Sequence, residues 1–144
     1  MDSGDSRREA GIVALVARFV DAVNRNDPEA FGRLWAPACR WELPGHPLAD
    51  GRDAAVALFE QVAAAREFQF QLQVNGVIDL RGWPVCGRWH VQEVARRRDG
   101  QGERILARYH DTYEEGPEGW WFTERRLEVL YREEAPLPGT YHGG

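Results

Sequence analysis

The pattern of apolar and polar positions changes period once along the chain, from helix-like at the start to strand-like in the second half. Over residues 6–24, apolar side chains recur at the i, i+3, i+4, i+7 spacing of an amphipathic helix. They are Ile12, Leu15, Val16, Phe19, Val20 and Val23. The pattern predicts a long helix that ends at Asn24, where the polar run 24–26 begins.

Two shorter helices are predicted next. Asp27 precedes Pro28, an order typical of an N-cap followed by the first helical residue. The apolar positions of this helix run as far as Trp35, and Pro37 is expected to stop it. A third helix is predicted over residues 52–66, capped by Asp50 or Gly51. Between these two helices, residues 39–43 read as a short strand that carries Trp41 and Glu42, followed by a Pro-rich loop with His46.

Strict alternation begins at residue 68. The segment 68–80 places aromatic and aliphatic side chains on one side and amides, including Gln71, on the other. A turn at 81–84 and a strand over 85–97 follow, and residues 99–102 carry a hairpin signal.

The last two strands are predicted within residues 104–131, joined by a turn at 116–119. One side of the first of these strands is mostly apolar or aromatic, and it consists of Ile105, Ala107, Tyr109, Asp111 and Tyr113. A carboxylate on a buried face is costly unless it is paired or hydrogen-bonded, and its pKa can move far from about 3.9. Asp111 is therefore a candidate for a functional group, with a structural ion pair as the alternative.

The order helix, helix, strand, helix and four strands predicts an α+β fold. We expect three helices packed on one face of a curved, mostly antiparallel sheet, giving a cone-shaped barrel that encloses a pocket. The 144 residues suit a single domain over 1–144, with its core at about 6–131 and a tail at 132–144 without regular structure.

Composition and charge exclude several classes of protein. The net charge of −5 argues against nucleic-acid binding. No apolar run approaches the roughly 20 residues of a membrane helix, and no secretory signal is visible. Two cysteines are too few for a disulfide scaffold. These features favour a cytoplasmic protein with reduced thiols and no nucleic-acid or membrane partner.

The length of the 99–102 loop decides which residues of its two strands are neighbours. A two-residue loop places His90 opposite Asp111, which would form a general-base pair. A three-residue loop places Trp89 opposite Asp111 and His90 opposite His110. We favour the second register because it aligns the apolar sets and puts both histidines on the outer face. That histidine pair lacks a third ligand in evident spacing, so no metal site is expected.

Several local sequences carry a resemblance to a known family. The element order, the Tyr109-x-Asp111-x-Tyr113 pattern, the run 118–122 and the Arg125-Arg126 pair resemble the SnoaL-like branch of the nuclear-transport-factor-like superfamily. The resemblance extends from about residue 11 to 131. It implies the cone fold, a small-molecule pocket and chemistry without a cofactor, as in the polyketide cyclases, scytalone dehydratase and ketosteroid isomerase of that superfamily.

The resemblance also points to particular positions. The dehydratases and the dehydrochlorinase of the superfamily share an Asp–His pair, which falls here at Asn24 and about Gln71. Amides donate and accept hydrogen bonds but do not take up a proton at neutral pH. The ketosteroid isomerases resemble this chain in having a base before a proline in the first strand and a protonated Asp later in the sheet. Those places correspond to Glu42 and Asp111.

Two hypotheses for function follow. The first is a cofactor-independent lyase or isomerase acting on a cyclic hydrophobic compound, with Asp111 handling the proton and Glu42 or His90 as partner base. Asn24, Gln71 and Tyr109 would hydrogen-bond the substrate, Arg126 would bind a carboxylate or form an ion pair, and three aromatic residues would stack on the ligand: Trp41, Trp89 and Phe122. The second is a ligand-binding or assembly module without catalysis. A homodimer through the outer sheet face is expected for either.

Overall fold

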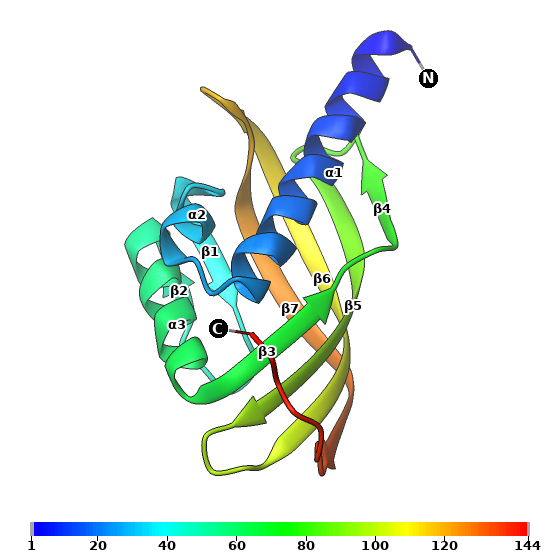
Figure 1. The fold of residues 1–144 in the computed structure, drawn as a ribbon. Coiled ribbons are helices and arrows are strands. Elements are labelled where there is room, and N and C mark those ends of the chain that lie inside the picture. Colours follow the sequence, from blue (N-terminus) through cyan, green and yellow to red (C-terminus); the bar gives the residue numbers. More distant parts are fainter. Residues whose placement is uncertain (1, 144) are drawn as a thin grey trace.

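The computed structural model describes residues 2–143, in which three helices pack on the concave face of a strongly curved sheet (Figure 1). The helices are α1 (Ser3–Asn24), α2 (Pro28–Gly32) and α3 (Arg52–Ala64). The strands are β1 (Trp35–Glu42), β2 (Ala49–Asp50), β3 (Arg66–Leu72), β4 (Gly76–Asp79), β5 (Val85–Arg97), β6 (Gly102–Gly116) and β7 (Gly119–Ala135). The predicted α+β cone is confirmed.

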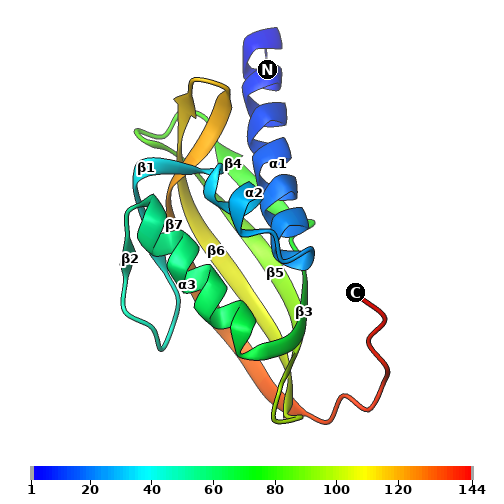
Figure 2. The same ribbon diagram turned by 60° about the vertical axis from the view of Figure 1, so that its left-hand side comes forward.

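The sheet runs in the order β2-β1-β7-β6-β5-β3, with β4 added to β5. Every pairing is antiparallel except that between β1 and β7, which is parallel. Helix α3 lies against β1 and β2, while α1 crosses the sheet near β3 (Figure 2). The helices therefore cover both ends of the concave face.

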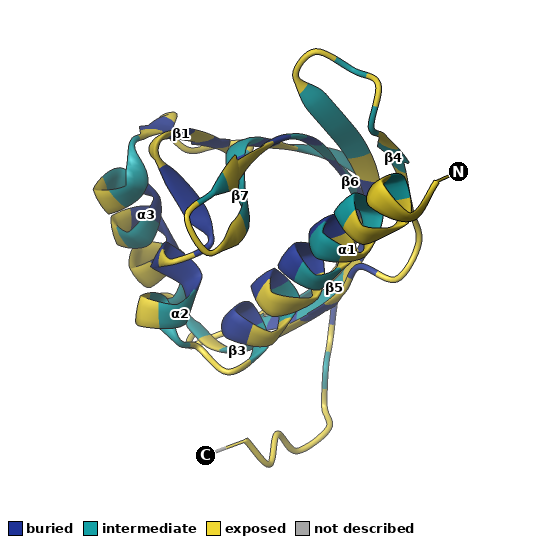
Figure 3. Ribbon diagram, turned by 90° about the horizontal axis from the view of Figure 1, so that it is seen from above, coloured by how far each residue is buried: buried dark blue, intermediate teal, exposed yellow. Residues whose placement is uncertain are grey.

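Helix α1 confirms the periodicity prediction. Its buried positions form one stripe, consisting of Ile12, Leu15, Val16, Phe19, Ala22 and Val23. The helix begins three residues earlier than the periodicity indicates, because the Asp2 carboxylate accepts the backbone N–H of Asp5 and caps it. Seen from above in Figure 3, the buried stripe faces the sheet.

Helix α2 is shorter than predicted. It ends at Gly32, and Trp35 is the first residue of β1 rather than part of the helix. Trp35 pairs with Phe122 in the parallel ladder, and the Phe122 N–H donates to the Leu34 carbonyl over 2.9 Å. This long-range pairing outweighs local helix propensity, since Trp35 is fully buried in the strand position.

The predicted strand over 68–80 is two strands, β3 and β4, separated at residues 73–75. The amide side of β3 faces the interior: Gln71 and Gln73 are buried, whereas Phe70, Leu72 and Val74 are exposed. The outer surface of β3 is therefore apolar and its inner surface polar, the reverse of an ordinary half-buried strand.

Both predicted registers of the β5–β6 hairpin are wrong. Gly87 lies opposite Asp111, Trp89 opposite Tyr109, and His90 opposite Arg108. The paired region ends at Arg96 and Gly102, so the connection is longer than the sequence signal indicated. The true register differs from the favoured one by two residues, which preserves the faces. Trp89 points inward and His90 outward, as that register predicted.

Strand β7 departs from regular alternation at two bulges. The pairing with β6 shifts between Thr112 and Tyr113, and again between Leu106 and Ala107. The strand also continues to Ala135, so the first residues of the predicted tail 132–144 are structured. The predicted turn is confirmed, because β6 ends at Gly116 and β7 begins at Gly119.

An aromatic cluster fills the space between helices and sheet. Its members are Phe19, Phe31, Trp35, Trp41, Phe59 and Phe122, with ring centroids 4.4–6.4 Å apart. Such pairs stabilise a core beyond simple burial of apolar area. Within residues 2–143, no helix has the length and apolar character needed to cross a membrane.

Candidate functional site

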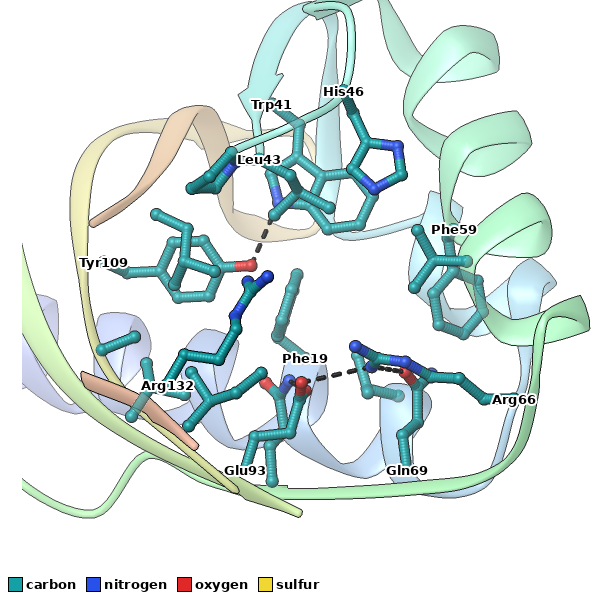
Figure 4. Close-up of a pocket in the computed structure, with 18 residues that line it drawn as sticks. Phe19, Trp41, Leu43, His46, Phe59, Arg66, Gln69, Glu93, Tyr109 and Arg132 are labelled. Carbon is teal, nitrogen blue, oxygen red and sulfur yellow. Dashed lines mark hydrogen bonds and ion pairs between the residues drawn. The ribbon is translucent and has the colours of Figure 1, made fainter. Parts of the chain in front are cut away.

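A cavity lies beside the aromatic cluster, between α1, α3 and the concave face of β3, β5, β6 and β7 (Figure 4). Its volume is about 90 Å³, counted as the space in which the centre of a water molecule can lie. Its apolar walls include Phe19, Trp41, Leu43, Phe59, Val62, Val91, Ile105 and Leu127. Its polar lining consists of His46, Arg66, Gln69, Gln71, Glu93, Tyr109 and Arg132. A single water needs roughly 10–15 Å³ of such space, so the cavity is large enough for a small ring.

Glu93 supplies a fixed carboxylate on the cavity wall. Its Oε1 accepts from Nη1 of Arg66 over 3.2 Å, and its Oε2 accepts from Nε2 of Gln71 over 2.8 Å. Arg66 also donates to Glu103 over 3.0 Å and to Gln69 over 2.6 Å. Only 12% of the Glu93 side chain is exposed. Among the described residues that line the cavity, Glu93 is the only carboxylate.

Glu93 is not among the site residues predicted from the sequence, although the sequence carries a signal for it. The inward positions of β5 follow the alternation Trp89, Val91, Glu93 and Ala95. A carboxylate in an otherwise apolar inward series is the same signal that drew attention to Asp111 on β6. The charged residues 96–98 that follow are typical of a solvated strand end, and they obscure this signal.

Tyr109 presents a hydroxyl to the same cavity. Its oxygen accepts the indole N–H of Trp41 over 3.1 Å. The phenol hydrogen has no acceptor among residues 2–143, so it is available to a ligand. Burial raises the pKa of Tyr109, and the phenol is neutral at physiological pH. Tyr109 thus lines the cavity as a hydrogen-bond donor, which agrees with its predicted position.

Asp111 is sheltered beneath the helices but is saturated by partners. Nε and Nη2 of Arg125 donate to its two oxygens over 2.7 and 3.1 Å, and the Tyr113 hydroxyl donates to Oδ2 over 2.7 Å. The Trp89 indole in turn donates to the Tyr113 oxygen over 3.0 Å. Burial raises the pKa of the Asp111 carboxyl, whereas the Arg125 guanidinium and the Tyr113 hydroxyl act to lower it. We refer to Trp89, Asp111, Tyr113 and Arg125 as the Asp111 cluster; its carboxylate does not line the cavity.

The guanidinium that meets Asp111 belongs to Arg125, not to Arg126. Phe122 faces inward opposite Tyr113, and regular alternation would place Arg126 on the same side as Phe122. The bulge leaves Thr123 without a partner and shifts the following residues, so Arg125 faces inward and Arg126 is exposed outside. The Arg125 guanidinium carbon lies 3.8 Å from the ring centroid of Tyr109.

Asn24 and Gln71, the positions that correspond to the family Asp–His pair, are joined to each other. The Asn24 amide accepts the backbone N–H of Gln71 and donates to its carbonyl, each over 2.9 Å. These bonds fasten the end of α1 to β3 in the manner of a strand pairing. The Gln71 side chain is buried between Glu93 and Gln73. The side chain of Asn24 is therefore occupied by the backbone rather than directed at a ligand.

The structure brings together only some of the predicted site residues. Trp41, Gln71 and Tyr109 line the cavity. Trp89 and Phe122 are buried but do not line it, and the exposed residues are Glu42, His90 and Arg126. The predicted pairing of Asp111 with Glu42 or His90 is wrong, because both of these side chains point away from the concave face. Glu42 lies beside Arg126 in the β1–β7 ladder.

Comparison with solved structures shows the same fold. A putative scytalone dehydratase from Novosphingobium aromaticivorans superposes with a TM-score of 0.85 at 18% identity, covering 98% of this chain and 100% of that one. A type 2 hexachlorocyclohexane dehydrochlorinase (LinA) gives 0.84 at 19% identity, covering 94% of each chain. The type 3 enzyme from Novosphingobium barchaimii gives 0.80 at 20% identity, covering 93% of this chain and 92% of that one.

The sequence itself matches a family model. No curated protein matches it significantly. The model that describes the SnoaL-like domain matches residues 5–126, which includes α2, α3, all but the first two residues of α1, and most of the sheet. This chain therefore belongs to the SnoaL-like domain family.

Proposed function

We propose that the protein is a cofactor-independent lyase or isomerase that acts on a small cyclic hydrophobic compound in the cavity. The observation that carries the proposal is the pairing of one anchored carboxylate, Glu93, with one unused phenol hydrogen, on Tyr109, in an otherwise largely apolar space. An acceptor for a proton and a donor for an oxygen are the two groups that enolisation requires.

The proposed reaction begins at a ring carbon next to a carbonyl group. Glu93 removes the proton from this carbon, and the electrons of the C–H bond form an enolate whose oxygen accepts the Tyr109 hydrogen bond. In a lyase reaction the enolate expels the β-carbon's hydroxyl group, which takes the proton from Glu93 and leaves as water, and a double bond forms between the α- and β-carbons. In an isomerase reaction a β,γ-double bond shifts instead, and Glu93 returns the proton to the γ-carbon. A carboxylate has about four acceptor sites, and the two bonds from Arg66 and Gln71 leave the others free.

The likeness to enzymes that eliminate water or chloride supports this reaction class. The relatives include proteins named as a putative scytalone dehydratase and a hexachlorocyclohexane dehydrochlorinase. In this chain an amide occupies each dyad position, but the Glu93 carboxylate is hydrogen-bonded to one of them, Gln71. The Glu93 carboxylate, which lies on the neighbouring strand β5, is thus next to the dyad position that Gln71 occupies.

A second function, ligand binding without turnover, is favoured by the Arg66–Glu93 ion pair. Arg66 engages one oxygen of the Glu93 carboxylate and Gln71 engages the other, so both oxygens already have partners within the protein. With Asn24 committed to the backbone of Gln71, the cavity would then hold a ligand rather than transform it.

Turnover of two simple cyclic ketones separates the two functions. The purified protein is incubated with 3-hydroxycyclohexanone, for dehydration, and with 3-cyclohexenone, for isomerisation, and the conjugated enone is followed by its ultraviolet absorbance. We expect enone formation above the buffer rate, and at least a hundredfold loss in Glu93→Gln without a matching drop in melting temperature. Wild-type turnover that Glu93→Gln retains would rule out Glu93 as the base. Binding of either ketone without turnover would support the second function.

We also propose that two copies pair through the outer face of the sheet. A row of aligned residues crosses this face, in which Leu72, Leu106 and Tyr131 are 42–50% exposed and Gln92 lies between Leu72 and Leu106. Large exposed apolar side chains that lie close together are typical of an interaction site. Light scattering after size exclusion should give a dimer mass for the wild type and a monomer mass for Leu106→Glu. A monomeric wild type would contradict the pairing.

A further inference from the structure

We propose that Arg132 is a ligand-binding, specificity-determining residue, and that the compound held in the cavity carries a carboxylate on its apolar ring. This inference rests on the proposed small-molecule function of the same cavity. It specifies the chemical class of the ligand and names the residue that selects it.

Arg132 faces the cavity because of the second bulge in β7. Leu106 pairs with Tyr131 and Ala107 pairs with Val129, so Leu130 is the extra residue. Beyond it, Arg132 pairs with Ile105, an inward-facing residue of β6 that also lines the cavity. Val129 faces inward. Without the bulge, regular alternation would therefore place Arg132 on the outer side of the sheet.

The Arg132 guanidinium donates no hydrogen bond to the protein within residues 2–143. Its Nε lies 4.0 Å from Oε2 of Glu103, an ion-pair contact beyond hydrogen-bond distance, and the other oxygen of Glu103 accepts from Arg66 over 3.0 Å. Arg66, the other cavity arginine, already donates to Glu93, Glu103 and Gln69. Figure 4 shows the Arg132 side chain extending over the cavity toward the hydroxyl end of Tyr109. Two residues that line the cavity, Tyr109 and Arg132, therefore offer donors that the described part of the protein does not use.

A carboxylate fits these donors better than a neutral oxygen does. Guanidinium presents a planar fork of N–H groups that matches the two oxygens of a carboxylate, and such charge-assisted bonds are about twice as strong as neutral ones. The Arg132 side chain is 50% exposed, so an anion bound there keeps part of its hydration. The ring of the same molecule would enter the apolar part of the cavity, whose 90 Å³ limits it to a small ring.

Isothermal titration calorimetry with two matched probes tests the inference. Cyclohexanecarboxylate and cyclohexanecarboxamide have the same shape and differ in charge. We expect wild-type protein to bind the carboxylate about tenfold to a hundredfold more tightly than the amide, the range for a hydrogen bond to a charged group. Arg132→Gln should lose this preference while its affinity for the amide stays the same. Equal binding of both probes by the wild type, or an unchanged preference in Arg132→Gln, would overturn the proposal.

A control variant and a conservative variant complete the test. Arg104→Gln removes an exposed arginine near the same end of the sheet, on its outer face, and should leave both affinities unchanged. Arg132→Lys keeps the charge without the planar fork and should give an intermediate preference; a preference equal to that of the wild type would contradict the fork geometry. Because the measurement is binding, a failure of turnover would count against the enzyme hypothesis and leave this inference standing.

Discussion

Two groups of polar side chains lie on the concave face of the same sheet, and they differ in whether they face the cavity. In the Asp111 cluster, both carboxylate oxygens accept hydrogen bonds within the protein, Nη1 of Arg125 is buried without a partner among the described residues, and no member of the cluster lines the cavity. Around the cavity, Tyr109 and Arg132 keep donors without acceptors among the described residues. This difference teaches that a buried charged group is costly to the fold but does not by itself mark a binding site. Unused hydrogen-bond donors that face a cavity are the better indication of a ligand site.

Removing the carboxylate from the Asp111 cluster should have the largest effect on stability. Asp111→Asn leaves the buried Arg125 charge without its counterion, and we expect a loss of about 3–5 kcal/mol in the free energy of unfolding. Urea denaturation followed by circular dichroism measures this loss. The matched variant Glu93→Gln, in the cavity wall, should lose clearly less, because its partner Arg66 retains Glu103.

The double variant Asp111→Leu/Arg125→Met sharpens the same prediction. Replacing both members of a buried ion pair by apolar side chains is often neutral or stabilising, so the double variant should be more stable than Asp111→Asn. If the double variant is no more stable than Asp111→Asn, the ion pair adds net stability to the fold. It would then do more than offset the cost of burying each charge.

The tyrosines provide a pH test of the two regions together. Burial raises the pKa of both Tyr109 and Tyr113 above the usual value of about 10. A raised phenol pKa means that folding favours the neutral form; the resulting stability is complete below about pH 10 and declines as pH rises further. Absorbance at 295 nm should show these two phenols ionising only as the protein unfolds. Ionisation of both near pH 10 in the folded protein would contradict their burial.

The exposed residues of the predicted site should have the smallest effects. His90→Gln and Arg126→Gln alter side chains on the outer face, and we expect each to change the unfolding free energy by no more than about 0.5 kcal/mol. Neither should change the affinity for cyclohexanecarboxylate. A marked loss of affinity in either variant would show that the ligand binds on the outer face of the sheet and not in the cavity.

Local periodicity predicted the features that depend on neighbours in sequence. It predicted the buried stripe of α1 and the inward face of β6 that carries Tyr109 and Asp111, because one side chain pattern repeats there without interruption. The turn at 116–119 was predicted from its glycines and proline. The family resemblance supplied the arrangement of these elements, which periodicity alone does not determine.

The predictions are wrong where a bulge breaks the alternation of a strand, or where pairing with a segment far along the chain determines the structure. The bulges at Thr123 and Leu130 bring Arg125 and Arg132 inward, and nothing in the local sequence marks either bulge. Trp35 was assigned to a helix because its pairing partner Phe122 is far along the chain. The β5–β6 register depends on a loop whose length its turn residues did not reveal.

Two indole N–H groups report separately on the two regions, and their NMR signals test the central claim. The Trp41 indole donates to Tyr109 at the cavity, and the Trp89 indole donates to Tyr113 in the Asp111 cluster. In ¹⁵N-labelled protein titrated with cyclohexanecarboxylate, with signals assigned from Trp41→Phe and Trp89→Phe, the Trp41 resonance should move in a saturable manner while the Trp89 resonance stays in place. Movement of the Trp89 signal with Trp41 unchanged would show that the ligand binds at the Asp111 cluster and not in the cavity.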